Sequence, residues 1–162
     1  MNIEYVCVSI TNQCNLSCEY CYRLGSSVDY ISTDCFINCL SKLKKLGCKK
    51  INISGGEPLL HPCWREYIRI SCEMGFSVFL STNGILLDIN DPILNLIDKL
   101  IIPLDASTNS INSKYRGKQQ FISAFNIIRE YKIHDYSFKL KINTVMTRDN
   151  LLDLSNMIPI LN

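Results

Sequence analysis

Three cysteines near the start of the chain are the residues best suited to chemistry. They are Cys14, Cys18 and Cys21, spaced CxxxCxxC, and they follow directly after an apolar segment that predicts a strand. A short irregular loop of this spacing can wrap three thiolates around an iron–sulfur cubane. Because a cubane usually takes one protein thiolate per iron, this set leaves one iron open to a ligand from outside the protein. The spacing therefore predicts a [4Fe-4S] cluster with an open coordination position.

Two simpler roles for these cysteines stay open. In the first, they belong to a structural zinc site completed by Cys39, Cys48 or His61. Zinc usually draws its cysteines from two CxxC-like pairs, however, and the sequence holds no second pair. In the second, the thiols only pack as small hydrophobic side chains. Burial is the simpler interpretation for the remaining cysteines, which are Cys7, Cys35, Cys39, Cys48, Cys63 and Cys72.

Two short polar segments follow the next two predicted strands. The first is Gly55-Gly56-Glu57-Pro58, in which the glycines let the backbone approach a ligand closely and the carboxylate can accept hydrogen bonds from an ammonium group. The second is Ser81-Thr82-Asn83-Gly84, whose short side chains could hold a carboxylate or a ribose. Each segment taken alone is also typical of a structural turn.

More polar groups are predicted at or near the same edge of the sheet. Asp105 and Ser107 follow the fourth predicted strand, Arg116 lies in the loop after them, and Asn143 lies on the fifth strand. Each of them could equally be a surface or capping residue.

The elements that must position these residues alternate between short β-rich runs and amphipathic helical runs. This alternation is typical of a parallel sheet built from βα units. The predicted strands are residues 4–10, 50–54, 77–81, 100–104 and 137–146. Helices are predicted after Ser32, from Pro62, over residues 91–97, around residues 121–128 and from Asn150.

The pattern predicts an α/β fold with about five βα units. Five units cannot close an eight-stranded barrel, so we expect an open, partial (βα) barrel. Residues 1–162 are expected to form one domain that is incomplete at its C-terminal end, with a sixth strand about to begin near residues 159–161. Ligands of such folds bind where the loops converge at the carboxyl ends of the strands.

Composition and charge exclude several function classes. The formal net charge of +2, with 17 scattered lysines and arginines, predicts neither a nucleic-acid nor a membrane partner. The N-terminus has no charged region followed by an apolar one, and no apolar run is long enough to span a bilayer. We therefore expect a cytoplasmic protein whose nine cysteines are thiols in a reducing compartment.

The cysteine motif and the two polar segments that follow the second and third predicted strands resemble, in this order and placement, those of the radical SAM superfamily. Tyr20 is the aromatic residue of the CxxxCxΦC motif. The resemblance implies a [4Fe-4S] cluster on Cys14, Cys18 and Cys21 that passes one electron to bound S-adenosylmethionine and yields a 5′-deoxyadenosyl radical. It also implies cofactor-binding roles for Tyr20, Gly55, Gly56, Glu57, Ser81, Asn83, Asp105 and Ser107. A flavodoxin or ferredoxin is the kind of electron donor that it implies.

Within the superfamily, residues 50–60 and 141–150 resemble the viperin-like antiviral nucleotide dehydratases. These lyases convert a nucleoside triphosphate to its 3′-deoxy-3′,4′-didehydro form. The resemblance implies that Lys50, Arg116, Lys141 and Asn143 contact the triphosphate or the ribose, and cations there would offset its charge. Alternatively, Lys139 and Lys141 are solvated residues that alternate with apolar ones on an edge strand.

Two other functions remain alternatives to a nucleotide dehydratase. One is a radical SAM enzyme that modifies a peptide or protein, a class that commonly adds a cysteine-rich domain after the core. The other is a non-catalytic metal-binding or interaction module. Metal content would separate the module from the enzymes, because zinc without sulfide favours the module and iron with sulfide favours an enzyme.

Overall fold

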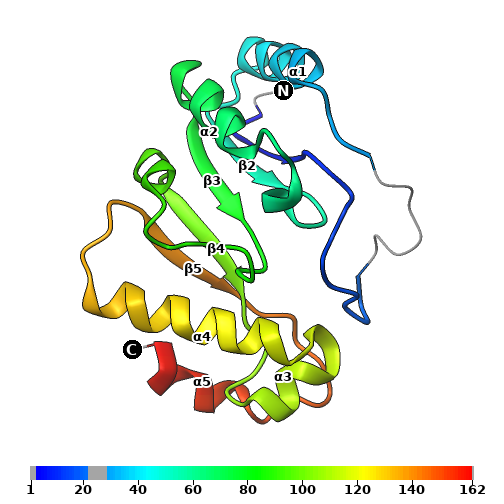
Figure 1. The fold of residues 1–162 in the computed structure, drawn as a ribbon, viewed down its shortest axis with the longest axis vertical. Helices are drawn as coiled ribbons and strands as arrows, with labels where there is room; N and C mark the ends of the chain where they lie inside the picture. Colours follow the sequence, from blue (N-terminus) through cyan, green and yellow to red (C-terminus); the bar gives the residue numbers. More distant parts are fainter. Residues whose placement is uncertain (1–2, 22–28, 162) are drawn as a thin grey trace.

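The fold is one parallel sheet with helical segments between successive strands and one helix after the last strand. A computed structural model describes residues 3–21 and 29–161 of the 162-residue chain. Its strands lie side by side in chain order (Figure 1): β1 (Tyr5–Ser9), β2 (Lys50–Ser54), β3 (Ser77–Ser81), β4 (Lys99–Pro103) and β5 (Lys139–Asn143). Every neighbouring pair is parallel, so all five carboxyl ends lie at one edge of the sheet. The predicted α/β class and open, partial barrel are confirmed.

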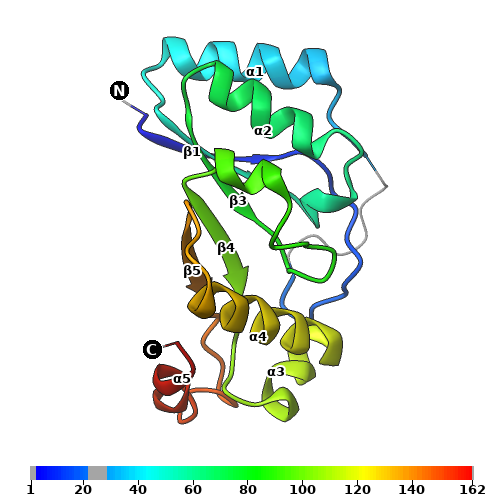
Figure 2. The same ribbon diagram turned by 60° about the vertical axis from the view of Figure 1, so that its left-hand side comes forward.

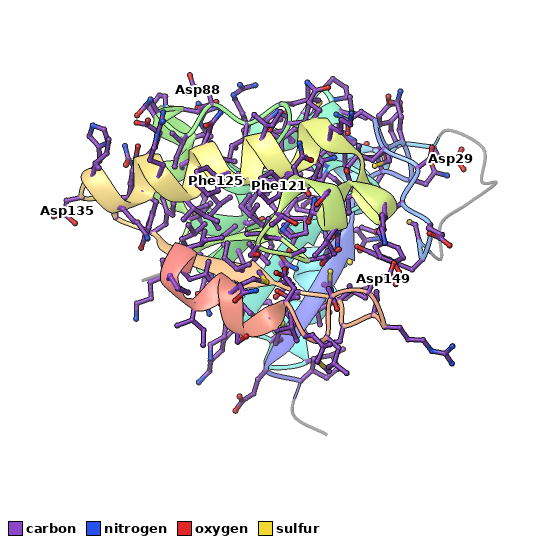
Figure 3. All side chains as sticks on the ribbon, turned by 90° about the horizontal axis from the view of Figure 1, so that it is seen from below. Asp29, Asp88, Phe121, Phe125, Asp135 and Asp149 are labelled. Atoms are coloured by element: carbon purple, nitrogen blue, oxygen red, sulfur yellow. The ribbon has the colours of Figure 1, made fainter. Side chains whose placement is uncertain are left out.

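Five helices accompany the strands in the part of the chain that the structure describes. They are α1 (Thr33–Lys45), α2 (Trp64–Glu73), α3 (Asn109–Arg116), α4 (Lys118–Ile133) and α5 (Leu154–Leu161), with two 3-10 turns, η1 (Pro58–Leu60) and η2 (Pro92–Leu96). In the two ribbon views α1 and α2 lie over the β1 to β3 half of the sheet, and α4 crosses near the lower ends of β4 and β5 (Figures 1 and 2). Phe121 and Phe125, one turn apart on α4, stack with ring centroids 6.0 Å apart (Figure 3).

The two faces of the sheet differ because side chains alternate along each strand. On the covered face Ile51, Ile53, Leu80, Leu100 and Ile102 are all fully buried. The opposite face carries the polar and charged residues that share their strands, and on β5 these are all exposed: Lys139, Lys141 and Asn143. The open face can therefore form a binding site at the carboxyl ends of the strands, where it carries polar residues.

Aromatic packing fixes the first crossover helix on the sheet. The rings of Phe36 on α1 and Tyr67 on α2 stack at a centroid distance of 4.2 Å, and neither is exposed. Tyr67 also donates a hydrogen bond from its hydroxyl to the Ile31 carbonyl at 2.8 Å. Ser32 caps α1 as predicted, with its hydroxyl accepting from the Cys35 amide. None of the described helices is long and apolar enough to cross a membrane.

Several predicted boundaries need correction. β2 and β3 have the predicted bounds, but β4 begins one residue early, at Lys99. Pro62 lies in a turn before α2, which begins at Trp64. Helix α3 was not predicted, since its stretch from Asn109 to Arg116 is mostly polar and Ile111 and Tyr115 alone make too short an apolar stripe.

The segment after β5 differs most from the prediction. β5 ends at Asn143 rather than at residue 146, because the chain then turns around the buried side chain of Asn150. That amide donates to the Asp105 and Val145 carbonyls at 2.7 and 2.8 Å and accepts from the Thr147 amide at 2.7 Å. Asn150 therefore organises the turn instead of starting a helix. α5 begins at Leu154 and includes residues 159–161, where a strand was expected.

We expect the core of the sheet to dominate stability. Leu100→Ala, on β4 and fully buried, should lower the free energy of unfolding by about 2–5 kcal/mol through lost burial and the cavity it leaves. Leu152→Ala is the matched control, because Leu152 is 91% exposed. Urea unfolding followed by circular dichroism measures both, and equal effects would contradict the assigned core.

Candidate active site

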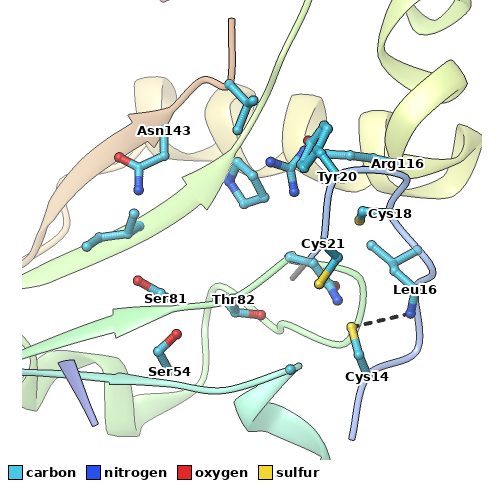
Figure 4. Close-up of a pocket in the computed structure, with 15 residues that line it drawn as sticks. Cys14, Leu16, Cys18, Tyr20, Cys21, Ser54, Ser81, Thr82, Arg116 and Asn143 are labelled. Carbon is cyan, nitrogen blue, oxygen red and sulfur yellow. Dashed lines mark hydrogen bonds between the residues drawn. The ribbon is translucent and has the colours of Figure 1, made fainter. Parts of the chain in front are cut away.

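A cavity of about 480 Å³ opens at the carboxyl ends of the strands. Figure 4 shows its walls, which come from the cysteine loop (residues 14–21) on one side and from strand ends on the other. Its lining residues are Cys14, Leu16, Cys18, Tyr20, Cys21, Ser54, Gly56, Ser81, Thr82, Asn83, Ile101, Pro103, Arg116, Asn143 and Val145. The structure thus brings the three predicted cysteines to one cavity with groups from β2, β3, β4 and β5.

In the cysteine loop Cys14 is an exposed residue, whereas Cys18 and Cys21 are half-buried. Cys14 Sγ accepts a hydrogen bond from the Leu16 amide at 3.4 Å, and the Cys21 amide donates to the Cys18 carbonyl at 3.0 Å. Partial burial raises the pKa of the Cys14 and Cys18 thiols, and in each case a neighbouring cysteine of the loop adds to the effect. The uncharged thiol is therefore favoured until a metal replaces its proton.

The residues that lead into the cysteine loop are attached to the glycine segment after β2. The Gly56 amide donates to the Thr11 carbonyl at 2.8 Å, and the Glu57 amide donates to the Gln13 carbonyl at 2.7 Å. A Cβ on Gly55 would lie 2.5 Å from the Thr11 carbonyl oxygen, and one on Gly56 would lie 2.3 Å from that of Gln13. Glycine is required at both positions because two backbone segments meet there.

Glu57 does not line the cavity. It is fully buried, and its carboxylate accepts from the Thr82 hydroxyl at 2.6 Å, the Asn83 amide at 2.7 Å and the Leu59 amide at 3.1 Å. Burial raises its pKa, and these three hydrogen bonds oppose the rise. The carboxylate thus ties the glycine segment to the segment after β3. Asn83 continues the chain of contacts by donating from its side chain to the Asn15 side chain at 2.7 Å.

The second half of the cysteine loop is attached to the end of β4 through Asp105. This carboxylate is 1% exposed and accepts a hydrogen bond from the Tyr20 hydroxyl. It forms an ion pair with Arg116, with Nε and Oδ2 2.5 Å apart, and accepts from the Val145 amide at 2.9 Å. The Arg116 guanidinium also lies over the Tyr20 ring, 5.1 Å from its centroid. Burial and the hydrogen bond to Asp105 raise the pKa of Tyr20, so its hydroxyl stays protonated.

The remaining predicted site residues lie at different places. Arg116 and Asn143 line the cavity, but Arg116 ends helix α3 rather than lying in a loop. Lys141 lies exposed on the open face of β5, opposite Ile101 of the cavity wall. Lys50 begins β2, about 13 Å from Ser54 at the other end of the strand, so the structure does not bring it to the cavity.

Ser107 holds the start of the last helix instead of facing the cavity. Its amide and its hydroxyl donate to the two carboxylate oxygens of Asp153, each at 2.6 Å. Burial disfavours the charged form of Asp153, but these bonds and one from Asn156 outweigh it and lower its pKa. Ser107 thereby fixes the entry to α5.

Buried amides that sequence reasoning missed support the cavity wall. Asn112 and Gln120 are fully buried, and Asn112 accepts from the Asp105 amide at 2.9 Å and donates to Gln120 at 2.9 Å. Gln120 in turn donates to the Pro103 carbonyl at 2.6 Å. The sequence signal for these residues is weak, because both fall in polar stretches where solvent exposure is the ordinary expectation.

The alternative zinc ligands do not reach the cysteine loop. His61 uses both ring nitrogens inside the protein, at 3.0 Å from the Ile31 carbonyl and 3.0 Å from the Cys63 amide. Neither Cys39 nor Cys48 lines the cavity. Within residues 3–21 and 29–161, no three His, Cys, Asp or Glu side chains are placed to hold one metal ion.

The six other cysteines were predicted to pack inside the protein. Cys48 is buried, and Cys39, Cys63 and Cys72 are half-buried. Cys7 and Cys35 are exposed, so the prediction was wrong for these two.

Three cysteines of one loop that face a roomy cavity fit a cubane better than a single ion, and the open side of that cavity leaves space for an organic ligand. The chain matches the family model of the radical SAM superfamily over residues 8–158. It therefore belongs to this superfamily, and the resemblance in the sequence is confirmed. Membership implies both cofactors of the family, a [4Fe-4S] cluster and S-adenosylmethionine.

Curated relatives include two kinds of nucleotide enzyme. The chain is 31% identical over 149 residues to a GTP 3′,8-cyclase of Synechocystis sp., covering 88% of the chain and 45% of the relative. It is 30% identical over 153 residues to an S-adenosylmethionine-dependent nucleotide dehydratase of Lacinutrix mariniflava, covering 86% of the chain and 32% of the relative. The chain thus spans less than half the length of these relatives.

Solved structures share the fold at lower identity. Streptococcus suis SuiB bound to S-adenosylmethionine aligns with a TM-score of 0.82 at 14% identity, covering 98% of this chain and 38% of SuiB. The enzyme anSMEcpe with bound AdoMet aligns with a TM-score of 0.73 at 19% identity, covering 91% of this chain and 44% of anSMEcpe. At these identities the likeness concerns the fold.

Gly56→Ala should detach the residues that lead into the cysteine loop, because the new methyl group would meet a backbone oxygen that cannot move aside. We expect a loss of about 1–3 kcal/mol in unfolding free energy and a several-fold fall in iron and sulfide after anaerobic reconstitution. Gly75→Ala is the control: its nearest neighbour is Lys44 Nζ at 3.7 Å and its φ is +80°, so backbone strain alone applies. Equal iron loading in both variants would contradict the attachment.

The pKa shifts of the thiols predict slow alkylation of the metal-free protein. Since burial raises the pKa of Cys14 and Cys18, the rate of their reaction with iodoacetamide should still be increasing above pH 9.0, the ordinary thiol value. Mass spectrometry of the cysteine peptides measures each rate, with exposed Cys35 on α1 as the internal reference. Reaction of Cys14 and Cys18 that reaches its plateau near neutral pH would contradict the shifts.

Proposed function

We propose that the chain is the core domain of a radical SAM enzyme that dehydrates a nucleoside triphosphate, as viperin-like enzymes do. The observation that carries the proposal is the sequence similarity to nucleotide dehydratases over most of the chain, together with a cysteine-lined cavity whose lining also includes polar residues from β5 and α3. When bound, the cluster and S-adenosylmethionine would supply a 5′-deoxyadenosyl radical that abstracts a hydrogen from the substrate.

The residues of the chain would bind and orient the two organic molecules. Ser81, Asn83 and the Gly56 backbone line the cavity at the ends of β2 and β3 and are suited to S-adenosylmethionine. Asn143 lines the same cavity from β5 and can hydrogen-bond a ribose hydroxyl or a phosphate. Apolar residues from the loop and β4, Leu16, Ile101 and Pro103, would keep water from the radical.

Charge for a triphosphate would come from the open face of β5. Arg116 is already paired with Asp105, so its charge is largely compensated and it mainly contributes to the lining of the cavity. Lys141 is exposed on the face that carries Asn143, two residues further from the cavity. We therefore assign the main phosphate contact to Lys141 and a secondary one to Arg116.

A GTP 3′,8-cyclase activity is the second candidate. Two observations favour it: the 31% identity to the Synechocystis sp. enzyme and 45% identity over 109 residues to a probable GTP 3′,8-cyclase of Methanocaldococcus jannaschii. Both candidates act on a nucleotide and need an electron donor such as a flavodoxin or ferredoxin. The two activities differ in the mass of the product. Dehydration removes one water from the substrate, whereas cyclisation only moves hydrogen within it and leaves its mass unchanged.

The test uses the reconstituted protein with S-adenosylmethionine, dithionite and each ribonucleoside triphosphate in turn. We expect 5′-deoxyadenosine to rise with one triphosphate, together with a product lighter by one water in the mass spectrum. A product of unchanged mass from GTP would favour the cyclase. 5′-Deoxyadenosine that is unaffected by nucleotides would remove both candidates and favour a peptide or protein substrate.

Lys141→Ala should raise the KM for the active triphosphate about tenfold, since a charge-assisted contact is lost. Lys139→Ala is the matched control: Lys139 lies on the same face of β5, about 7 Å further from the cavity. Steady-state kinetics of 5′-deoxyadenosine release measures both variants. A larger effect from Lys139 than from Lys141 would contradict the assignment.

A further inference from the structure

We propose that Asp105 is a positioning residue for the iron ligands: its buried carboxylate holds Tyr20, and through Tyr20 it sets where Cys18 and Cys21 stand relative to Cys14. The inference concerns the cluster site and holds for any substrate, so it does not depend on the nucleotide assignment. It gives Asp105 a role other than direct contact with S-adenosylmethionine, and Asp105 is absent from the cavity lining.

The cysteine loop is held at two ends by different parts of the sheet. Before Cys14, the loop backbone bonds to Gly56 and Glu57 after β2. Beyond Cys18, the Glu19 amide donates to the Tyr115 carbonyl at the end of α3, at 3.2 Å, and the Tyr20 hydroxyl donates to Asp105. The spacing between Cys14 and the other two thiols therefore depends on both attachments.

Tyr20 is the side chain that transmits the second attachment. It lies in the sequence between Cys18 and Cys21, and all three line the cavity. Its ring packs 5.8 Å from the ring of Tyr115 and 5.1 Å from the Arg116 guanidinium, so it is held on its faces as well as at its hydroxyl. A displacement of Tyr20 would therefore also displace the backbone of Cys18 and Cys21.

The carboxylate of Asp105 suits this role because it only accepts hydrogen bonds. Oδ2 faces the Tyr20 hydroxyl and Arg116 Nε, while Oδ1 faces the Val145 amide at 2.9 Å and Arg116 Nη2 at 3.5 Å. A carboxamide in the same place would turn an N–H toward one set of these donors and leave Arg116, whose side chain is 12% exposed, without its counter-charge.

The experiment compares Tyr20→Phe, Asp105→Asn and Asp149→Asn with the wild-type chain after anaerobic reconstitution. Asp149, between β5 and α5 (Figure 3), is the matched control: it pairs with Lys114 of α3 at 2.9 Å, and its side chain is 40% exposed. The readouts are iron and sulfide per chain, the electron paramagnetic resonance spectrum of the reduced cluster, and its change on titration with S-adenosylmethionine.

We expect Asp105→Asn to bind several-fold less iron, and Tyr20→Phe to keep its cluster but to require about tenfold more S-adenosylmethionine for the same spectral change. Asp149→Asn should match the wild type. Iron content and a titration like those of the wild type in both Tyr20→Phe and Asp105→Asn would overturn the proposal.

Asp105→Asn is the variant at risk of not folding, because it leaves a buried cation. If it does not fold, Tyr20→Phe decides alone, since it removes one hydroxyl and keeps the ring: a wild-type titration overturns the proposal and a weakened one supports it. None of these readouts involves a nucleotide, so their outcome is independent of the proposed substrate.

Discussion

The site depends on a contact between two stretches of backbone that leaves no room for a side chain. Gly55 and Gly56 lie against residues 11–13, and a Cβ on Gly56 would come within 2.3 Å of a carbonyl oxygen. Paired amide and carbonyl groups then fix the start of the cysteine loop to the end of β2. This contact decides where the cysteine loop leaves the sheet, and with it the place of Cys14.

Buried polar groups carry the rest of the arrangement. Glu57 joins the segments after β2 and β3, and Asp105 joins the cysteine loop, α3 and the segment after β5. Each carboxylate is buried but satisfied by several donors, and such a group is costly to disturb. The two acids make these hydrogen bonds within the protein, and the cavity lining consists mainly of thiols, short polar side chains and apolar residues.

The fold could be predicted largely from the sequence, because the apolar runs of parallel strands and the spacing of CxxxCxxC are local signals. The bounds of β2 and β3 and the gathering of Cys14, Cys18 and Cys21 at the strand ends all agree with the structure. The failures concern long-range contacts. Asn150 looks like a helix cap but serves a turn around β4 and β5, and the polar α3 depends on contacts of Asn112 that no periodicity reveals.

The substrate side is less determined by local pattern than the cofactor side. Lys50, Arg116 and Lys141 look alike as cations in the sequence, yet one lies at the far end of its strand, one is paired with Asp105, and one is free to face a ligand on the open sheet. Their differences arise from strand register and from the partner that each charge finds, which only the assembled sheet defines.

The most direct test of the account is a crystal structure of the anaerobically reconstituted chain with S-adenosylmethionine, with diffraction recorded at the iron absorption edge. The account predicts a single iron cluster bonded to Cys14, Cys18 and Cys21, with the loop still attached to Gly56 at one end and to Asp105 at the other. Iron bound by other cysteines, or a cluster whose loop has left both attachments, would contradict it.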